Sequence, residues 1–130
     1  MSLLEIIKDD YQRFPQNPTY EIYASDVYFA DPMTQFNGLA KYQQMIKFIS
    51  QWFLEIQLDL HEISQADQII KTRWTLSWTA AVPWKPRISI PGRSELKIND
   101  QNLIASHIDY WDCSRLDVLK QFFNFFQDRS

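Results

Sequence analysis

The chain has 130 residues, and its composition excludes several classes of protein. Thirteen Lys and Arg face sixteen Asp and Glu, so the net charge is −3 and no basic stripe is available for nucleic-acid phosphates. The single cysteine excludes an internal disulfide and is typical of a cytoplasmic protein. No apolar run approaches the roughly 20 residues of a membrane span. We therefore expect a cytoplasmic protein without nucleic-acid or membrane partners, folded as a single domain over residues 1–130.

Helical spacing of apolar residues dominates the first half of the chain. Proline residues punctuate this half and end the first helical pattern. The predicted elements, in chain order, are a helix over 3–14, a short helix capped by Thr19, a strand over 27–31, a loop over 33–38 and a helix over 39–54.

Beyond residue 55 the apolar residues alternate with polar ones, which is typical of strands. Pro91-Gly92 predicts a bulge inside one of these strands. The predicted elements are strands over 56–61, 73–82, 87–98 and 103–112, turns at 65–68 and 99–102, and a capped helix from Ser114 to Phe126. Grouped helices followed by long hairpin strands predict an α+β fold: a cone-shaped, curved antiparallel sheet wrapped around the N-terminal helices, with a helix at the C-terminus.

The strand over 103–112 carries the most informative side chains. Alternation predicts that His107, Asp109 and Trp111 share one face, and that the opposite face carries Ile104, Ser106, Ile108 and Tyr110. A carboxylate that accepts from an imidazole N–H orients the ring and raises its basicity, which is the minimum for a general base. A buried polar pair with a purely structural role fits the pattern equally well.

Two local patterns resemble the nuclear transport factor 2-like superfamily, also called SnoaL-like, which includes ketosteroid isomerase. They are IYASDVYFADP over residues 22–32 and INDQNLI over residues 98–104. More narrowly, the segments YFADP, PWKPR and SHIDYWD resemble an uncharacterised branch found in cyanobacteria and plant plastids. The resemblance implies the cone-shaped α+β barrel over the whole chain, whereas this fold carries enzymes, transporters and scaffolds alike.

The resemblance also implies roles for individual residues. Asp31 stands where ketosteroid isomerase has its general base, and Tyr11 can take the part of its oxyanion-hole tyrosine. The protonated aspartate of that oxyanion hole aligns with Ser94, which is a weaker donor. The resemblance therefore implies a base and an aromatic wall, without the complete steroid isomerase site. An aspartate before a proline also caps turns, and this structural reading of Asp31 is the simpler one.

These observations define the candidate site. Its candidate catalytic residues are Asp31, His107 and Asp109, and its candidate ligand-binding residues are Tyr11, Phe29, Trp74, Trp78, Ser94 and Trp111. Two histidines without a spaced His or Cys cluster predict no metal site, and no cofactor motif is present.

Three functions are compatible with this sequence. The first is binding of a small, flat, largely apolar ligand in the cone. The alternatives are a cofactor-free lyase or isomerase that uses Asp31 or His107 for proton transfer, and an assembly or scaffold protein with a vestigial cavity. We also expect a homodimer, with Ile108 and Tyr110 in a sheet-to-sheet contact. The aromatic run over 122–126 is predicted to pack on the sheet or on a second subunit.

Overall fold

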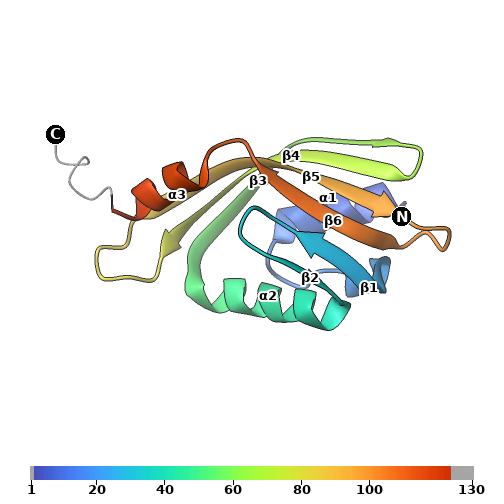
Figure 1. The fold of residues 1–130 in the computed structure, drawn as a ribbon, viewed down its shortest axis with the longest axis horizontal. Helices are drawn as coiled ribbons and strands as arrows, with labels where there is room; N and C mark the ends of the chain where they lie inside the picture. The colour runs from blue at the N-terminus through green and yellow to red at the C-terminus, as the bar shows by residue number, and fades with distance from the viewer. Residues whose placement is uncertain (1, 124–130) are drawn as a thin grey trace.

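A computed structural model describes residues 2–123 of the chain (Figure 1). It contains helices, a six-stranded sheet and a final helix, which confirms the predicted α+β class. The elements in chain order are α1 (Leu3–Arg13), the 3₁₀ helix η1 (Tyr20–Ile22), β1 (Tyr23–Ala30), β2 (Gln35–Asn37), α2 (Leu39–Trp52), β3 (Phe53–Ala66), β4 (Ile69–Ala80), β5 (Arg87–Ile98), β6 (Ile104–Trp111) and α3 (Arg115–Phe122).

The strands form one sheet in the order β2-β1-β6-β5-β4-β3. Neighbours are antiparallel except for β1 and β6, which run parallel. The prediction of a wholly antiparallel sheet was wrong at this pair. Hairpins force antiparallel pairing only between strands joined by a tight turn, and β1 and β6 are separated by most of the chain.

Helix α2 spans the open side of the curved sheet (Figure 1). It contacts β1 near one edge and β3 at the other edge, so the sheet bends around it. Helix α1 begins with a capping box in which Ser2 and Glu5 bond to each other's backbone amides, and it packs on β3. The Tyr11 hydroxyl lies 2.9 Å from Thr72 Oγ1, which ties α1 to β4.

Asp10 organises the segment after α1. Thr19 donates to Asp10 from its backbone N–H at 2.9 Å and from its hydroxyl at 2.8 Å. The hydroxyl of Thr19 is therefore engaged with Asp10 and makes no cap to the following turn, contrary to the prediction. The predicted short helix is the single 3₁₀ turn η1.

The junction between α2 and β3 differs from the predicted helix over 39–54. The helix ends at Trp52, and Phe53 already pairs with Ala80 of β4. The Phe53 ring stacks on Trp78 with centroids 4.3 Å apart and planes at 14°. This stacking and the strand pairing are tertiary contacts that helical periodicity does not contain.

The predicted bulge at Pro91-Gly92 is absent. Strand β5 pairs in unbroken register with β4, with Pro91 opposite Thr75 and Gly92 opposite Trp74. The carbonyl of Pro91 accepts from Asp112 N at 2.8 Å, just beyond the end of β6. The missing N–H of Pro91 therefore faces the side where β6 has ended, and no β4–β5 hydrogen bond is lost.

A register shift in β6 changes the predicted faces of that strand. Ser106 pairs with Lys97 and Ile104 pairs with Ile98, so Ala105 is an extra residue. The extra residue turns Ile104 to the inside, where it is fully buried. Ile104 therefore shares the inner face with His107, whereas simple alternation placed the two on opposite faces.

The buried apolar residues form three clusters. The first fills the end of the cone beside α1 and includes Ile70, Leu96 and Ile104. The second surrounds Trp74 and Trp78 under α3, and the third lies under α2; its members are Phe29, Tyr42 and Ile46. At the end of the cone that carries α3, the second and third clusters are therefore separate from each other.

Two predictions concern the outer face of the sheet and the C-terminal end: the homodimer contact and the packing of the aromatic run over 122–126. Ile108 and Tyr110 are partly exposed, and the Arg93 guanidinium lies 4.7 Å from the centre of the Tyr110 ring. The homodimer through this face stays a prediction. Helix α3 has the predicted capping box of Ser114 and Asp117. Phe122 packs against the second cluster, whereas Phe123 is exposed and stacks on the Trp84 ring. The part of the predicted aromatic run from residue 124 on lies outside the described residues.

No helix among the described residues is both long enough and apolar enough to cross a membrane.

Gly92 provides a test of the packing that holds β4 and β5 together. A Cβ at this position would lie 2.5 Å from the Trp74 indole, which covers the glycine from the opposite strand. Gly92→Ala should therefore lower the free energy of unfolding by about 1–3 kcal/mol in urea titrations. In a double-mutant cycle with Trp74→Leu, the alanine should cost much less, because the clashing ring is gone. An equal cost in both backgrounds would contradict this account.

Candidate functional site

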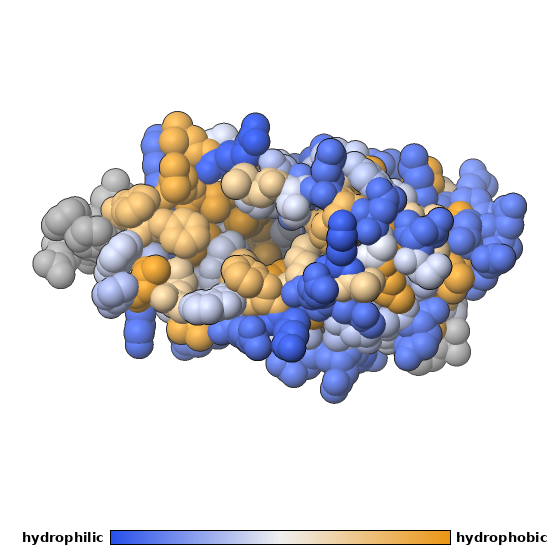
Figure 2. Space-filling model, turned by 60° about the horizontal axis from the view of Figure 1, so that its bottom comes forward, coloured by the Kyte–Doolittle hydropathy of each residue, from blue (hydrophilic) through white to orange (hydrophobic). Residues whose placement is uncertain are grey.

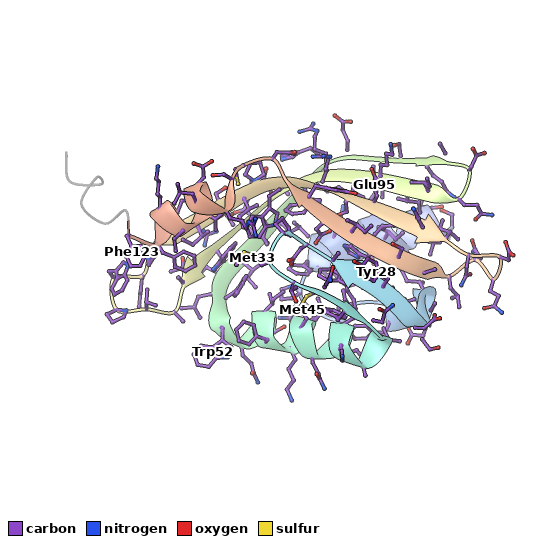
Figure 3. All side chains as sticks on the ribbon, viewed as in Figure 1. Tyr28, Met33, Met45, Trp52, Glu95 and Phe123 are labelled. Carbon is purple, nitrogen blue, oxygen red and sulfur yellow. The ribbon has the colours of Figure 1, made fainter. Side chains whose placement is uncertain are left out.

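A cavity of about 660 Å³ lies between the second and third core clusters. Its wall is mainly apolar and aromatic. In Figure 3 Met45 reaches from α2 toward the sheet, whereas Trp52 lies outside on the surface. Figure 2 shows apolar side chains gathered toward one end of the molecule around a hollow. The volume falls within the range of small-molecule sites, about 300–1,000 Å³.

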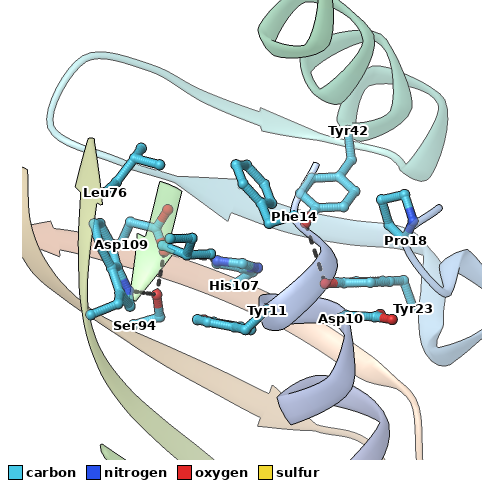
Figure 4. A pocket seen from close by; sticks show the side chains of 12 residues that line it. Asp10, Tyr11, Phe14, Pro18, Tyr23, Tyr42, Leu76, Ser94, His107 and Asp109 are labelled. Carbon is cyan, nitrogen blue, oxygen red and sulfur yellow. Dashed lines mark hydrogen bonds and ion pairs between the residues drawn. The ribbon is translucent and has the colours of Figure 1, made fainter. Parts of the chain in front are cut away.

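A chain of hydrogen bonds crosses the sheet at the polar part of this wall (Figure 4). Trp74 Nε1 donates to Ser94 Oγ at 2.8 Å, and Ser94 Oγ donates to Asp109 Oδ1 at 2.5 Å. His107 Nε2 lies 2.8 Å from the same oxygen. One carboxylate oxygen thus serves two donors from β5 and β6, and it orients the imidazole.

Two aromatic rings lie next to the imidazole of His107, and both are tilted relative to it. Its side chain is 10% exposed, and its ring centre lies 5.2 Å from that of Phe29 and 6.0 Å from that of Tyr42. In the neutral imidazole with Nε2 as the donor to Asp109, Nδ1 is an acceptor. Nδ1 is buried and has no hydrogen-bond partner among the described residues. Such an atom in a cavity wall calls for a partner.

Asp31 both caps a turn and lines the cavity. Its Oδ1 accepts from the backbone N–H groups of Met33 and Thr34, each at 2.8 Å, as the structural reading of an Asp-Pro step predicts. Burial raises the pKa of Asp31, and the Asp109 charge raises it further against the lowering effect of the two amides and His107. Asp31 is therefore a carboxyl whose ionised form is disfavoured by its surroundings.

A second, smaller pocket of about 100 Å³ lies beside the cavity, on the side toward α1. Tyr11 and Ser94 line it, together with Asp109 (Figure 4). Burial, followed by the charge of Asp109, raises the pKa of Tyr11 to about 12. Burial likewise raises the pKa of Tyr23 and Tyr42, whose hydroxyls lie 3.3 Å apart. These hydroxyls remain neutral hydrogen-bonding groups at physiological pH.

The nine candidate residues line two neighbouring pockets. Both pockets have His107, Asp109 and Trp74 in their walls. The larger cavity also contacts Asp31, Phe29, Trp78 and Trp111, and the smaller pocket contacts Tyr11 and Ser94. The chemical roles of these residues stay predictions.

Two groups of lining residues were missed by the sequence reasoning. The first is the inner face of α2, with Tyr42, Ile46 and Ile49. The periodicity of 39–54 marked this face as buried, so the signal was present but was assigned to the core. The second is α3, whose Arg115 and Val118 close one side of the cavity. No local pattern tells where a C-terminal helix docks.

Metal binding finds no support in the geometry of the described part of the chain. Within residues 2–123, no three side chains of His, Cys, Asp or Glu lie close enough together to hold a metal ion.

Solved structures of similar fold cover nearly the whole chain. A hypothetical protein from Catenulispora acidiphila with a ketosteroid isomerase-like fold, in complex with trimethylamine, has a TM-score of 0.73 and 15% identity over 93% of both chains. A putative SnoaL-like polyketide cyclase from Shewanella putrefaciens has a TM-score of 0.71 and 16% identity, over 92% of this chain and 94% of its own. An LEH-like epoxide hydrolase from M. tuberculosis has a TM-score of 0.72 and 11% identity, over 96% and 95%.

At these identities the likeness shows the fold alone, and it confirms the predicted NTF2-like, SnoaL-like resemblance. No functionally curated protein matches the sequence. The family described as an uncharacterized conserved protein (DUF2358) matches residues 1–107. The chain is thus a member of the DUF2358 family, built on an NTF2-like fold.

Proposed function

We propose that this protein binds a small, flat, largely apolar ligand inside the cone. The observation that carries the proposal is the cavity of about 660 Å³, which has aromatic walls from both the sheet and α2. Stacked and flat aromatic surfaces such as Phe53 on Trp78 favour planar ligands. A core packed for stability alone has few voids larger than a water molecule.

The hydrogen bonds at the deep end favour binding over steroid isomerase chemistry. The Ser94 hydroxyl donates a hydrogen bond to Asp109, and the Tyr11 hydroxyl is hydrogen-bonded to Thr72. An oxyanion hole needs donors that are free to meet a developing charge. Structures of the same fold include one in complex with trimethylamine and one named a polyketide cyclase, so the fold is compatible with small-molecule ligands.

Two neighbouring residues of α2 test whether the cavity is the binding site. Ile49 lines the cavity, whereas Phe48 is 55% exposed on the surface. We expect the neutral fluorescent probe N-phenylnaphthylamine to bind the wild type and Phe48→Trp alike. Ile49→Trp should weaken binding at least about tenfold, because the larger ring occupies the cavity. Equal binding to Ile49→Trp would place the probe elsewhere, and no binding to any form would favour the scaffold role.

A second candidate function is proton transfer by a cofactor-free isomerase or lyase. The favouring observation is the His107–Asp109 pair, in which a carboxylate oxygen 2.8 Å from Nε2 orients a buried imidazole. Asp31 lines the same cavity as a carboxyl with a raised pKa. These are the components of a general acid–base site.

Solvent exchange tests this second function without a known substrate. In deuterium oxide, an acid–base site should exchange the α-hydrogens of some members of a panel of apolar ketones, followed by NMR. His107→Ala should lower that exchange at least about 100-fold. The matched control is His61→Ala, because His61 is exposed and its ring bonds, among the described residues, to Thr75 alone. Absence of exchange by the wild type, or equal loss in both variants, would argue against catalysis.

The raised pKa of Asp31 predicts a pH-dependent effect on stability. The folded state holds the Asp31 proton to higher pH than the unfolded state, so its contribution to stability falls as pH rises through that window. Asn at position 31 keeps an oxygen for the Met33 and Thr34 amides and carries no charge. Asp31→Asn should therefore melt at a higher temperature than the wild type at about pH 7, and this gain should vanish near pH 3. The neighbouring titratable groups, Asp109 and His107, are the same in both proteins. A lower melting temperature for the variant at neutral pH would refute this reading.

A further inference from the structure

The polar part of the cavity wall is rich in acceptors and poor in donors. Asp31 and Asp109 each use Oδ1 for all of their hydrogen bonds. The Oδ2 atoms of both residues accept no hydrogen bond from any described residue, and both residues line the cavity. The Nδ1 atom of His107, which is buried behind the same wall, has no hydrogen-bond partner among the described residues either.

The positively charged side chains of the described residues do not donate to these acceptors. Among the residues that line the main cavity, the cationic side chain is Arg115, and its Nη1 donates to the carbonyl of Pro32 at 3.3 Å. No described Lys or Arg lies within ion-pair distance of Asp31 or Asp109. His107 Nε2 is engaged with Asp109 Oδ1 and leaves the second oxygen of that carboxylate open.

The rest of the wall also favours positive charge. The rings of Phe29, Tyr42, Trp74, Trp78 and Trp111 line the cavity, and the face of an aromatic ring attracts cations. Two partly buried carboxylates that repel each other gain from a cation placed between them, and the raised pKa of Asp31 reflects this repulsion in part. Apolar walls with two open carboxylate oxygens suit a ligand that has an apolar body and a positively charged group.

We infer that the ligand of this cavity is an organic ammonium ion, whose apolar body lies among the aromatic rings and whose charged nitrogen meets Asp31 and Asp109. The inference rests on the proposed ligand binding and adds the charge of the ligand to it. A metal ion is not an equivalent occupant, because no three metal-ligating side chains converge within the described residues.

Three probes of similar shape separate charge from shape. Phenethylammonium, propylbenzene and hydrocinnamate carry a positive, a neutral and a negative end on the same phenyl body. In isothermal titration calorimetry we expect phenethylammonium to bind at least about tenfold more tightly than propylbenzene, and hydrocinnamate to bind most weakly.

Replacement of each aspartate by asparagine tests the contribution of the carboxylate charge most directly. Asparagine keeps the Oδ1 acceptor that the neighbouring donors use and changes only the open oxygen. Asp31→Asn and Asp109→Asn should each weaken phenethylammonium binding about three- to tenfold more than they weaken propylbenzene binding. Asp26→Asn is the matched control, since Asp26 is an exposed aspartate of β1 that is absent from the cavity wall. It should change neither affinity.

The outcomes separate this inference from the function on which it rests. Binding of propylbenzene as tightly as phenethylammonium would overturn the ammonium inference and leave apolar ligand binding in place. Tighter binding of hydrocinnamate, or the same loss with Asp26→Asn, would also overturn it. Failure of all three probes to bind the wild type, together with no binding of N-phenylnaphthylamine, would overturn both the inference and the proposed function.

Discussion

The contact between Trp74 and Gly92 is the constraint on which the site depends. The indole lies over the glycine of the neighbouring strand so closely that even a methyl group would clash. In this position the indole N–H meets Ser94, and Ser94 in turn meets Asp109. The orientation of His107 follows from Asp109. A close packing contact thus sets the direction of a polar chain that spans three strands, because each hydrogen bond restricts the next side chain.

The curvature of the sheet explains why a hollow exists at all. Helix α2 contacts strands near both edges of the sheet, so the sheet bends around it. The apolar residues beside α1 fill the narrow end, and the two clusters farther along do not meet across the wider end. The space between them is lined by large rings, which cannot rotate to fill it without leaving their packed positions. Burial of Asp31 at this hollow raises its pKa, which is a cost in stability at neutral pH that a structural core does not require.

Much of the candidate site was predictable because it lies on regular strands. Alternation placed His107, Asp109 and Trp111 on one face, and all three line the cavity. Trp74 and Trp78, named as ligand-binding candidates, also line it. The partners of these residues were not predictable. The bond from Ser94 to Asp109 joins residues on separate strands, and its existence depends on the register of β5 with β6. Ile104 shows the same limit within a single strand, since one extra residue reversed its face.

The sequence by itself determined the α+β class, the change from helical to strand periodicity near residue 55, the capping box of the C-terminal helix and the residues that the strands contribute to the candidate site. These features depend on spacing along the chain, which local physical chemistry reads directly. Only the tertiary structure decided where α2 ends, that β1 pairs parallel with β6, that α3 closes the cavity, and which carboxylate oxygens remain open. Those features depend on contacts between segments far apart in the chain, and the energies of such contacts exceed the local preferences that a sequence pattern records.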